Sequence, residues 1–332
     1  MAKRIEVSVL SEQDIVASSP SRAEIIGIIE RTYRGCADEG ASQIPTKIGV
    51  HPETSPGSFC HAMPAWIAPE RALGMKWISY FPGNGAAGLG VPDSSGIIVL
   101  NDPDNGMPLA ILEGMWITYA RTAACAAVAA RHLAADGAVR LGLVGCGGLG
   151  KWSLRMLSEA LPALREIRVA SRSKESRERF CREMSAEGPW NLVPVDSNED
   201  AVRGMDIVVS SIQKTATPQA LESWWSAGTL VIPLDVAGCW DVATFERADR
   251  VITDGYAAFV RAAARDRPAL NLPESRHVRL EDVVAGRAPG RASPHERAIA
   301  IPTGVASVDM TLAWEIYRRA RDAGRGTKVA LT

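Results

Sequence analysis

The sequence has no excess of either charge. Its 332 residues contain 37 Lys and Arg against 38 Asp and Glu, and neither sign forms a long run. A nucleic-acid surface or a polybasic membrane-binding face needs a concentration of positive charge. We therefore expect neither a nucleic-acid partner nor a membrane partner. A charged small-molecule substrate must then be held by a few locally placed side chains.

Cysteine is sparse and scattered. The six cysteines form no CxxC pair and no Cys/His cluster, so neither a zinc site nor a disulfide framework is expected, and we expect no bound metal. The basic start, residues 1–7, is not followed by the apolar segment of a signal peptide. The apolar stretch near it is far shorter than the about 20 residues that cross a bilayer. These absences predict a cytoplasmic protein.

The segment from residue 59 to about residue 114 is rich in predicted strands. Asp102-Pro103-Asp104-Asn105-Gly106 is a strong turn signal between two apolar runs, which predicts a hairpin. Residues 116–134 are rich in Ala and free of Gly and Pro, which predicts a closely packed helix. The predicted strands are residues 59–67, 73–81, 95–101 and 108–113.

From Asp136 onward, short apolar segments alternate with longer helical ones. Apolar strands separated by helices indicate a parallel sheet covered on both faces, as in a doubly wound nucleotide-binding domain. We expect this Rossmann-type domain to span residues 136–302. The predicted strands are 139–146, 166–171, 206–212, 228–236 and 250–253, and the predicted helices between them include 149–161 and 174–185.

The C-terminal segment 304–324 is predicted to be a helix with one apolar stripe. Val308, Leu312, Ile316 and Ala320 recur every four residues. Such a stripe has to pack against something, and we expect it to rejoin the N-terminal β-rich part. The predicted fold class is therefore α/β, with one domain formed by residues 1–135 and 303–332 and the other by 136–302.

A glycine-rich turn marks the start of the predicted nucleotide-binding domain. Gly145, Gly147 and Gly150 form GxGxxG directly after an apolar strand and at the start of a helix, which is the context that gives this otherwise weak pattern its meaning. The backbone N–H groups at such a helix start bind a pyrophosphate. We expect this turn, including Gly148 and Leu149, to bind a dinucleotide; the alternative is a glycine-rich turn without a ligand.

The end of the second predicted strand bears on which dinucleotide binds. An NAD site usually has Asp or Glu here, but this chain has Ser171, Arg172 and Ser173. Arginine and hydroxyl groups suit a 2′-phosphate, which a carboxylate would repel. We therefore expect NADP(H), with NAD(H) as the alternative. In a simpler interpretation, Arg172 only solvates the start of the helix.

Several motifs resemble the ornithine cyclodeaminase/μ-crystallin family, in order and over nearly the whole chain. They are Met63-Pro64-Ala65, Gly74-Met75-Lys76-Trp77, Phe81-Pro82-Gly83-Asn84, Ile117-Thr118-Tyr119-Ala120-Arg121-Thr122-Ala123-Ala124, the GxGxxG turn, and Gly304-Val305-Ala306-Ser307-Val308-Asp309. The resemblance implies an N-terminal domain that supplies substrate residues and a homodimer interface, and a Rossmann domain that holds the nicotinamide.

The resemblance also implies roles for two basic residues. Lys76 would contact the substrate carboxylate or transfer a proton, and Arg121 would pair with that carboxylate, since a guanidinium binds a carboxylate bidentately. A buried lysine can act as acid or base. Without the resemblance, Lys76 could face solvent and Arg121 could form a structural salt bridge. Thr122 and Ser211 are further candidates for binding the cofactor.

Departures from the family pattern concern the substrate. Lys47 offers the basic residue of a Pro-x-Arg/Lys element, His61 stands where alanine dehydrogenase-like members have Arg, and Asp93 replaces Thr in a Gly-Leu-Pro-Thr motif. These residues are candidates for binding the substrate, although His61 and Asp93 could instead face solvent or bond loop backbone. Asp235 is the candidate for the catalytic carboxylate after the fifth Rossmann strand, with Asp241 as the second candidate.

Three functions are consistent with these features. The first is NADP(H)-dependent reduction of an imine (ketimine) to an amino acid, or the reverse amino-acid dehydrogenation. The second is a cyclodeaminase-like lyase step with internally recycled NAD. The third is a non-catalytic protein that binds NADPH or a small ligand, as μ-crystallin-like proteins can. Retention of both Lys76 and Arg121 favours chemistry over storage.

Overall fold

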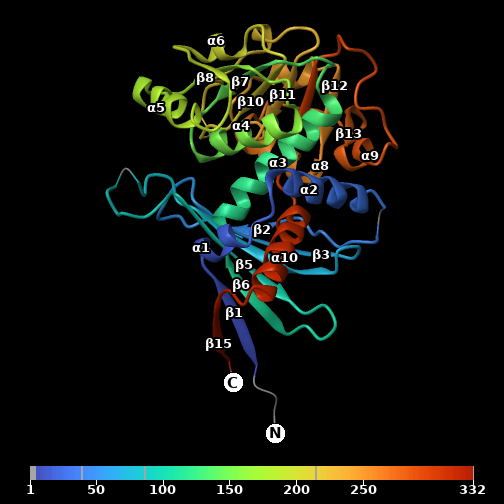
Figure 1. The fold of residues 1–332 in the computed structure, drawn as a ribbon. Coiled ribbons are helices and arrows are strands. Elements are labelled where there is room, and N and C mark those ends of the chain that lie inside the picture. Colours follow the sequence, from blue (N-terminus) through green and yellow to red (C-terminus); the bar gives the residue numbers. More distant parts are fainter. Residues whose placement is uncertain (1–4, 39, 86, 214, 332) are drawn as a thin grey trace. The chain divides into compact units, whose positions relative to one another are not determined.

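The computed structural model describes residues 5–38, 40–85, 87–213 and 215–331. The chain forms two compact units, which are drawn in Figure 1. The first unit comprises residues 1–121 and 305–332, and the second comprises residues 122–304. The sequence instead predicts the boundary between the two domains at residues 135/136. The difference is helix α3 (Met115–Leu133), a single uninterrupted helix whose first turns belong to the first unit and whose remainder belongs to the second.

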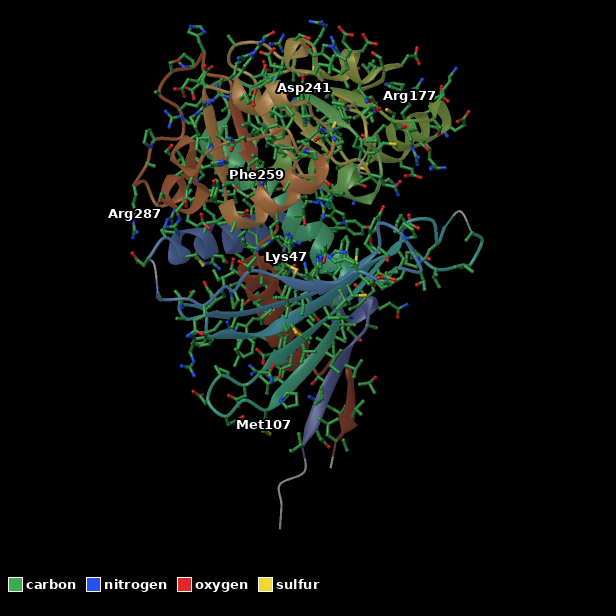
Figure 2. All side chains as sticks on the ribbon, turned by 180° about the vertical axis from the view of Figure 1, so that it is seen from behind. Lys47, Met107, Arg177, Asp241, Phe259 and Arg287 are labelled. Atoms are coloured by element: carbon green, nitrogen blue, oxygen red, sulfur yellow. The ribbon has the colours of Figure 1, made fainter. Side chains whose placement is uncertain are left out.

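The first unit is built on a seven-stranded sheet of order β15-β1-β6-β5-β4-β3-β2. Strands β1 and β6 pair in parallel, and the other neighbours are antiparallel. The predicted hairpin is confirmed: β5 and β6 are antiparallel neighbours, and Figure 2 shows Met107 at the turn that joins them. The strands are β1 (Glu6–Leu10), β2 (Ile48–Val50), β3 (Phe59–Ile67), β4 (Ala72–Tyr80), β5 (Ser94–Asn101), β6 (Pro108–Glu113) and β15 (Thr327–Ala330).

Helices cover one face of this sheet. Helix α10 (Ala306–Asp322) packs on β3, β4 and β5 and on α2 (Arg22–Cys36), as Figure 1 shows, and α1 (Glu12–Ala17) packs near β1. The four residues of the predicted stripe, Val308 to Ala320, are all buried. The C-terminal helix therefore rejoins the N-terminal sheet, as predicted. The sequence patterns do not predict β1, α1, α2, β2 or β15.

The second unit is a doubly wound α/β domain. Its eight-stranded sheet has the order β13-β12-β14-β11-β10-β7-β8-β9, and every paired neighbour is parallel, as expected for a Rossmann-type fold. The strands are β7 (Arg140–Val144), β8 (Glu166–Ala170), β9 (Asn191–Pro194), β10 (Ile207–Ser210), β11 (Leu230–Pro233), β12 (Arg250–Thr253), β13 (His277–Arg279) and β14 (Ala298–Ile301). The helices are α4 (Gly148–Ala160), α5 (Lys174–Met184), α6 (Asn198–Val202), α7 (Val242–Glu246), α8 (Tyr256–Asp266) and α9 (Leu280–Val284).

The strand order explains where this unit can bind a ligand. From β7 the chain runs outward through β8 and β9, then returns to β10 on the other side of β7. Ligands of such sheets bind at the carboxyl ends of the strands, where the order reverses. The GxGxxG turn follows β7, and Ser211 follows β10, so both lie at this reversal.

No helix within the described ranges is both long enough and apolar enough to cross a membrane.

Candidate functional site

Lys76 is buried on the covered face of the first unit's sheet. It lies in β4 opposite Met63 of β3, and its side chain is 1% exposed. Helix α10 packs over this strand, and Gly74 permits the close approach, because a Cβ there would lie 3.1 Å from the Met310 sulfur and 2.2 Å from the Val99 carbonyl oxygen. The alternative that Lys76 faces solvent is therefore wrong.

Asp309 of α10 joins Lys76 to Arg121. Its Oδ1 accepts a hydrogen bond from Lys76 Nζ at 2.7 Å and another from Arg121 Nε at 2.8 Å. Asp309 is fully buried and Arg121 is 6% exposed. Asp309 Oδ2 is buried and has no hydrogen-bond partner within the described part of the chain. We call Lys76, Arg121 and Asp309 the buried triad.

The buried triad changes the acidity of Lys76. Burial and the nearby positive charges of Arg121 and Lys47 together lower the pKa of Lys76 to about 7, while Asp309 opposes them. Removing an ammonium group from water disfavours its charged form, and like charges add to that effect. Near neutral pH, Lys76 can therefore both donate and accept a proton, which a solvent-exposed lysine cannot do efficiently.

Sequence reasoning missed Asp309 as a site residue. Asp309 was visible as the last residue of the Gly304–Asp309 motif, but no role was assigned to it. The available signal was an acidic residue in the first turn of a helix, directly beside Val308 of the apolar stripe. An acid so close to a buried stripe is buried only when it is paired.

The predicted substrate residues Lys47 and His61 lie in the same unit as the triad. Lys47 precedes β2 (Figure 2) and is close enough to affect the pKa of Lys76. His61 of β3 pairs with Ile78 of β4, so the pleat places its side chain on the same face as Lys76. The ring of His61 stacks on Phe59 at 4.1 Å between centroids.

Asp93 lies in the loop before β5, where it organises the backbone. Its Oδ1 accepts from the Gly85 N–H at 3.1 Å, and its carbonyl oxygen accepts from the Phe81 N–H at 2.7 Å. It is also near Tyr80, whose pKa is raised by burial and by the Asp93 charge. The simpler interpretation of Asp93, that it bonds loop backbone, therefore describes part of its role.

The glycine-rich turn has the geometry that each glycine predicts. Gly145 has φ +114°, and a Cβ there would lie 2.7 Å from the Ser211 carbonyl oxygen. A Cβ on Gly150 would lie 2.4 Å from the Gly145 carbonyl oxygen, so this position packs the helix on the turn. At Gly147, in contrast, a Cβ would meet nothing within 4 Å. The first and third glycines are required by protein packing, and the second leaves the backbone accessible to a ligand.

Helix α4 begins without a side-chain cap. Gly147 is its N-cap residue and provides no side chain to accept from the first turn, in which Gly148 is exposed and Leu149 is half-buried. Uncapped N–H groups at the start of a 13-residue helix attract an anion, and the helix dipole adds to the attraction. The turn therefore fits a dinucleotide pyrophosphate.

The end of β8 lacks the acid of a usual NAD site. Ser171 Oγ donates to the Ser173 carbonyl oxygen at 2.9 Å, and Ser173 caps α5 by accepting from the Ser176 N–H at 3.2 Å. Arg172 is exposed. Arg177 of α5, labelled in Figure 2, forms an ion pair with Asp196 in the loop after β9. Both hydroxyl groups thus organise the start of α5, beside an exposed guanidinium.

Asp235 lies in the loop after β11, at the carboxyl edge of the parallel sheet. Its Oδ2 accepts from the Ile212 N–H at 3.4 Å and its Oδ1 from the Cys239 N–H at 3.2 Å. Burial raises the pKa of Asp235 to about 6, although the hydrogen bonds of Ser210, Ile212 and Cys239 oppose that shift. The carboxyl group is therefore poised between its two protonation states near pH 6.

Asp241, the second acidic candidate, makes a different kind of contact. It is the N-cap residue of α7 (Figure 2), and its Oδ1 accepts from the backbone N–H groups of Thr244 and Glu222. This geometry supports a structural role for Asp241. Of the remaining cofactor candidates, Ser211 donates its N–H to the Val144 carbonyl oxygen at 2.9 Å beside the glycine-rich turn, and Thr122 follows Arg121 in α3.

The site residues divide between the two units. The buried triad, Lys47, His61 and Asp93 belong to the first unit, and the glycine-rich turn, Ser171, Arg172, Asp235 and Ser211 belong to the second. Among the described residues, no group of three or more His, Cys, Asp or Glu side chains could hold a metal ion.

Two relatives match this chain over most of its length. It is 30% identical over 325 residues to the nodulation efficiency protein NfeD of Rhizobium meliloti, covering 97% of this chain and 98% of that protein. It is 28% identical to the N-((2S)-2-amino-2-carboxyethyl)-L-glutamate dehydrogenase of Staphylococcus aureus, covering 81% of each chain.

A solved structure and a family profile extend this similarity. The Δ1-pyrroline-2-carboxylate reductase of Thermococcus litoralis, solved in complex with NADH and L-proline, superimposes with a TM-score of 0.88 at 25% identity, covering 97% of this chain and all of that one. The profile of the ornithine cyclodeaminase/mu-crystallin family matches residues 6–324. This chain belongs to the ornithine cyclodeaminase/mu-crystallin family.

Proposed function

We propose that this protein is an NADP(H)-dependent oxidoreductase that reduces an imine (ketimine) to an amino acid and catalyses the reverse dehydrogenation. The observation that carries the proposal is the buried triad, in which one carboxylate holds a lysine of near-neutral pKa beside an arginine. Two relatives point the same way, because one is named as a dehydrogenase of an amino-acid derivative and the other as a reductase of a cyclic imine.

Arg121 is proposed to orient the substrate carboxylate. Asp309 holds the guanidinium plane through Nε, and a planar guanidinium presents parallel N–H donors that match a carboxylate. Fixing the carboxylate fixes the adjacent α-carbon, which is the reacting atom of an α-imino acid. Three further residues are proposed to bind the rest of the substrate. Lys47 is close to Lys76, His61 lies on the same face of the sheet as Lys76, and the third residue is Asp93.

Lys76 is proposed to supply the proton. Reduction of an imine adds a hydride to carbon and a proton to nitrogen, and the bound nicotinamide supplies only the hydride. A lysine of pKa about 7 donates its proton near neutral pH and regains it from solvent after the product leaves. In the reverse direction, the neutral amine of Lys76 accepts the proton from the substrate ammonium group.

The second unit is proposed to bind NADP(H). The open Cβ direction at Gly147 and the uncapped start of α4 fit the pyrophosphate. Exposed Arg172, with Ser171 and Ser173 beside it, suits a 2′-phosphate better than the two hydroxyls of an NAD ribose. Asp235, at the carboxyl edge of the same sheet, is proposed as the second catalytic group.

The protein is further proposed to be a homodimer. Trp77 of β4 and Ile97 of β5 are cross-strand neighbours on the sheet face opposite Lys76, and they are 39% and 43% exposed. Large apolar side chains that adjoin each other on an exposed sheet face are a feature of interfaces. A second copy of the same face would cover them symmetrically.

Absorbance at the NADPH band tests the proposal. Keto acids mixed with ammonia or amines generate a panel of imines, and the proposal predicts NADPH consumption with at least one of them. Release of ammonia from a diamino acid without net change in cofactor would indicate the cyclodeaminase reaction instead. Binding of NADPH without turnover of any imine or amino acid would indicate a binding protein.

A further inference from the structure

Arg267 is a buried arginine that hydrogen bonds to backbone carbonyls. It follows α8 and is 5% exposed. Its Nε donates to the Trp240 carbonyl oxygen at 2.8 Å, its Nη2 to that of Gly238 at 2.8 Å, and its Nη1 to that of Thr215 at 3.1 Å. A fourth bond, at 2.7 Å, goes to the carbonyl oxygen of the neighbouring Asp266.

Three of these carbonyls belong to the two loops at the centre of the cofactor edge. Thr215 lies in the loop after β10, and Gly238 and Trp240 lie in the loop after β11. Asp235 also connects these two loops, because it accepts from the N–H group of Ile212 after β10 and from that of Cys239 after β11. Arg267 therefore bonds the carbonyls of the two loops, and Asp235 bonds their N–H groups.

The charge of Arg267 needs an explanation beyond these bonds. Burying a guanidinium is costly, and neutral carbonyls satisfy its donors without neutralising its charge. Asp235 is the acid whose ionised form the positive charge of Arg267 favours. The other groups acting on Asp235 are the Ser210 hydroxyl and the two N–H groups. The Cys239 thiol faces the same charges, and its pKa is raised by burial and by Asp235.

We infer that Arg267 is a positioning residue of the dinucleotide site: it clamps together the loops after β10 and β11, which also hold the Asp235 carboxylate, and its positive charge favours the ionised form of that carboxylate. The inference rests on the proposed function, in which Asp235 acts at the cofactor edge. Arg267 does not contact substrate or cofactor in this scheme. It acts through Asp235 and through the position of the two loops.

Replacement of Arg267 should change the acidity of Asp235 in a charge-dependent way. Burial already raises the pKa of Asp235 to about 6, and loss of a nearby cation raises it further. Arg267→Gln removes the charge, so Asp235 should titrate at a higher pH. Arg267→Lys retains the charge but not the forked donors, so the pKa should stay close to that of the wild type while the loops loosen.

The experiment measures the acidity without relying on catalysis. The full-length protein is labelled with ¹³C at the aspartate carboxyl carbons and titrated by NMR, and Asp235→Asn identifies the Asp235 signal. Hydrogen exchange of the loop after β11 and the dissociation constant of NADPH are measured for both Arg267 variants. Arg261→Gln, which removes an exposed arginine from α8, the helix that Arg267 follows, serves as the matched control.

The inference expects three results together. Asp235 titrates higher in Arg267→Gln but not in Arg267→Lys or Arg261→Gln, the loop exchanges faster in both Arg267 variants, and NADPH binds at least several-fold more weakly in both. An unchanged Asp235 titration in a folded Arg267→Gln protein would overturn the inference. So would failure of both Arg267 variants to fold, because Arg267 would then be purely structural. If these three results are obtained but the protein shows no turnover, the proposed function would be contradicted and the inference about Arg267 would not.

Discussion

Asp309 Oδ1 accepts hydrogen bonds from Lys76 Nζ and Arg121 Nε at nearly equal lengths, 2.7 and 2.8 Å. The buried negative charge of Asp309, on α10, is thus shared by two cations. Lys76 comes from strand β4 and Arg121 from helix α3. The shared carboxylate explains why two basic groups can be buried side by side. It also fixes both groups relative to each other, whatever the substrate is.

Asp309→Asn should lower the pKa of Lys76 below about 7, because Asp309 is what stabilises the protonated amine. If protonated Lys76 is the donor in imine reduction, activity falls as pH rises through this pKa, so the falling limb should move to lower pH. We expect kcat/KM at pH 7.5 to decrease by about 10²-fold. The measurement is kcat/KM from pH 5.5 to 9, with circular dichroism to confirm folding.

Thr311→Val is a matched control for that variant. Thr311 is also buried in α10, where its hydroxyl accepts from Thr32 and donates to the Ser307 carbonyl oxygen, and it is not part of the triad. Its replacement should affect stability and leave the pH profile unchanged. An equal shift of the limb in both variants would show that the effect comes from repacking of α10 and not from the Asp309 charge.

Lys76→Met should damage turnover and leave cofactor binding intact. Methionine preserves much of the apolar stem of lysine but cannot transfer a proton, so kcat should fall by about 10²–10⁴-fold. The proposed dinucleotide residues belong to the second unit and Lys76 to the first, so the dissociation constant of NADPH should remain within about twofold of the wild-type value. Near-normal turnover would refute the proposed role of Lys76, and equal loss of cofactor binding would indicate misfolding.

Arg172→Ala should distinguish the two cofactors. Loss of one charge-assisted contact to the 2′-phosphate should weaken NADPH binding by about 1.5–3 kcal/mol and leave NADH binding nearly unchanged. Fluorescence titration with each cofactor measures both constants. Arg179→Ala, which removes an exposed arginine further along α5, should affect neither. Tighter binding of NADH than of NADPH by the wild type would contradict the NADP(H) assignment.

The second unit was the easier one to predict from sequence. Its strands β7, β8 and β12 are short apolar segments separated by amphipathic helices, and the structure places them within two residues of the predicted ends. Strand β14 was missed because Ala298–Ile301 is only four residues long and uniformly apolar, so it has neither a period of 2 nor one of 3.6. A fully buried central strand has no solvent-facing side to reveal it.

The buried triad could be predicted only in part. Lys76 and Arg121 were recognised from the motifs around them, but their distance in space depends on how α10 packs over β4. That packing joins residues 233 positions apart in the chain, and no local pattern contains it. Asp235 was placed at the carboxyl end of a strand for a local reason, whereas its link to Arg267 requires knowledge of where α8 ends.

A charged residue on the face of the first unit's sheet opposite Lys76 should prevent dimer formation. Trp77 and Ile97 adjoin each other on this face, and burying a glutamate against apolar side chains without a partner is costly. Trp77→Glu should therefore give a monomer in light scattering at micromolar concentration, where the wild type is expected to give a dimer. Val260→Glu changes an apolar side chain that is 41% exposed on α8 and should leave the dimer intact. A monomeric wild type would refute the proposed assembly, and a dimeric Trp77→Glu protein would place the interface elsewhere.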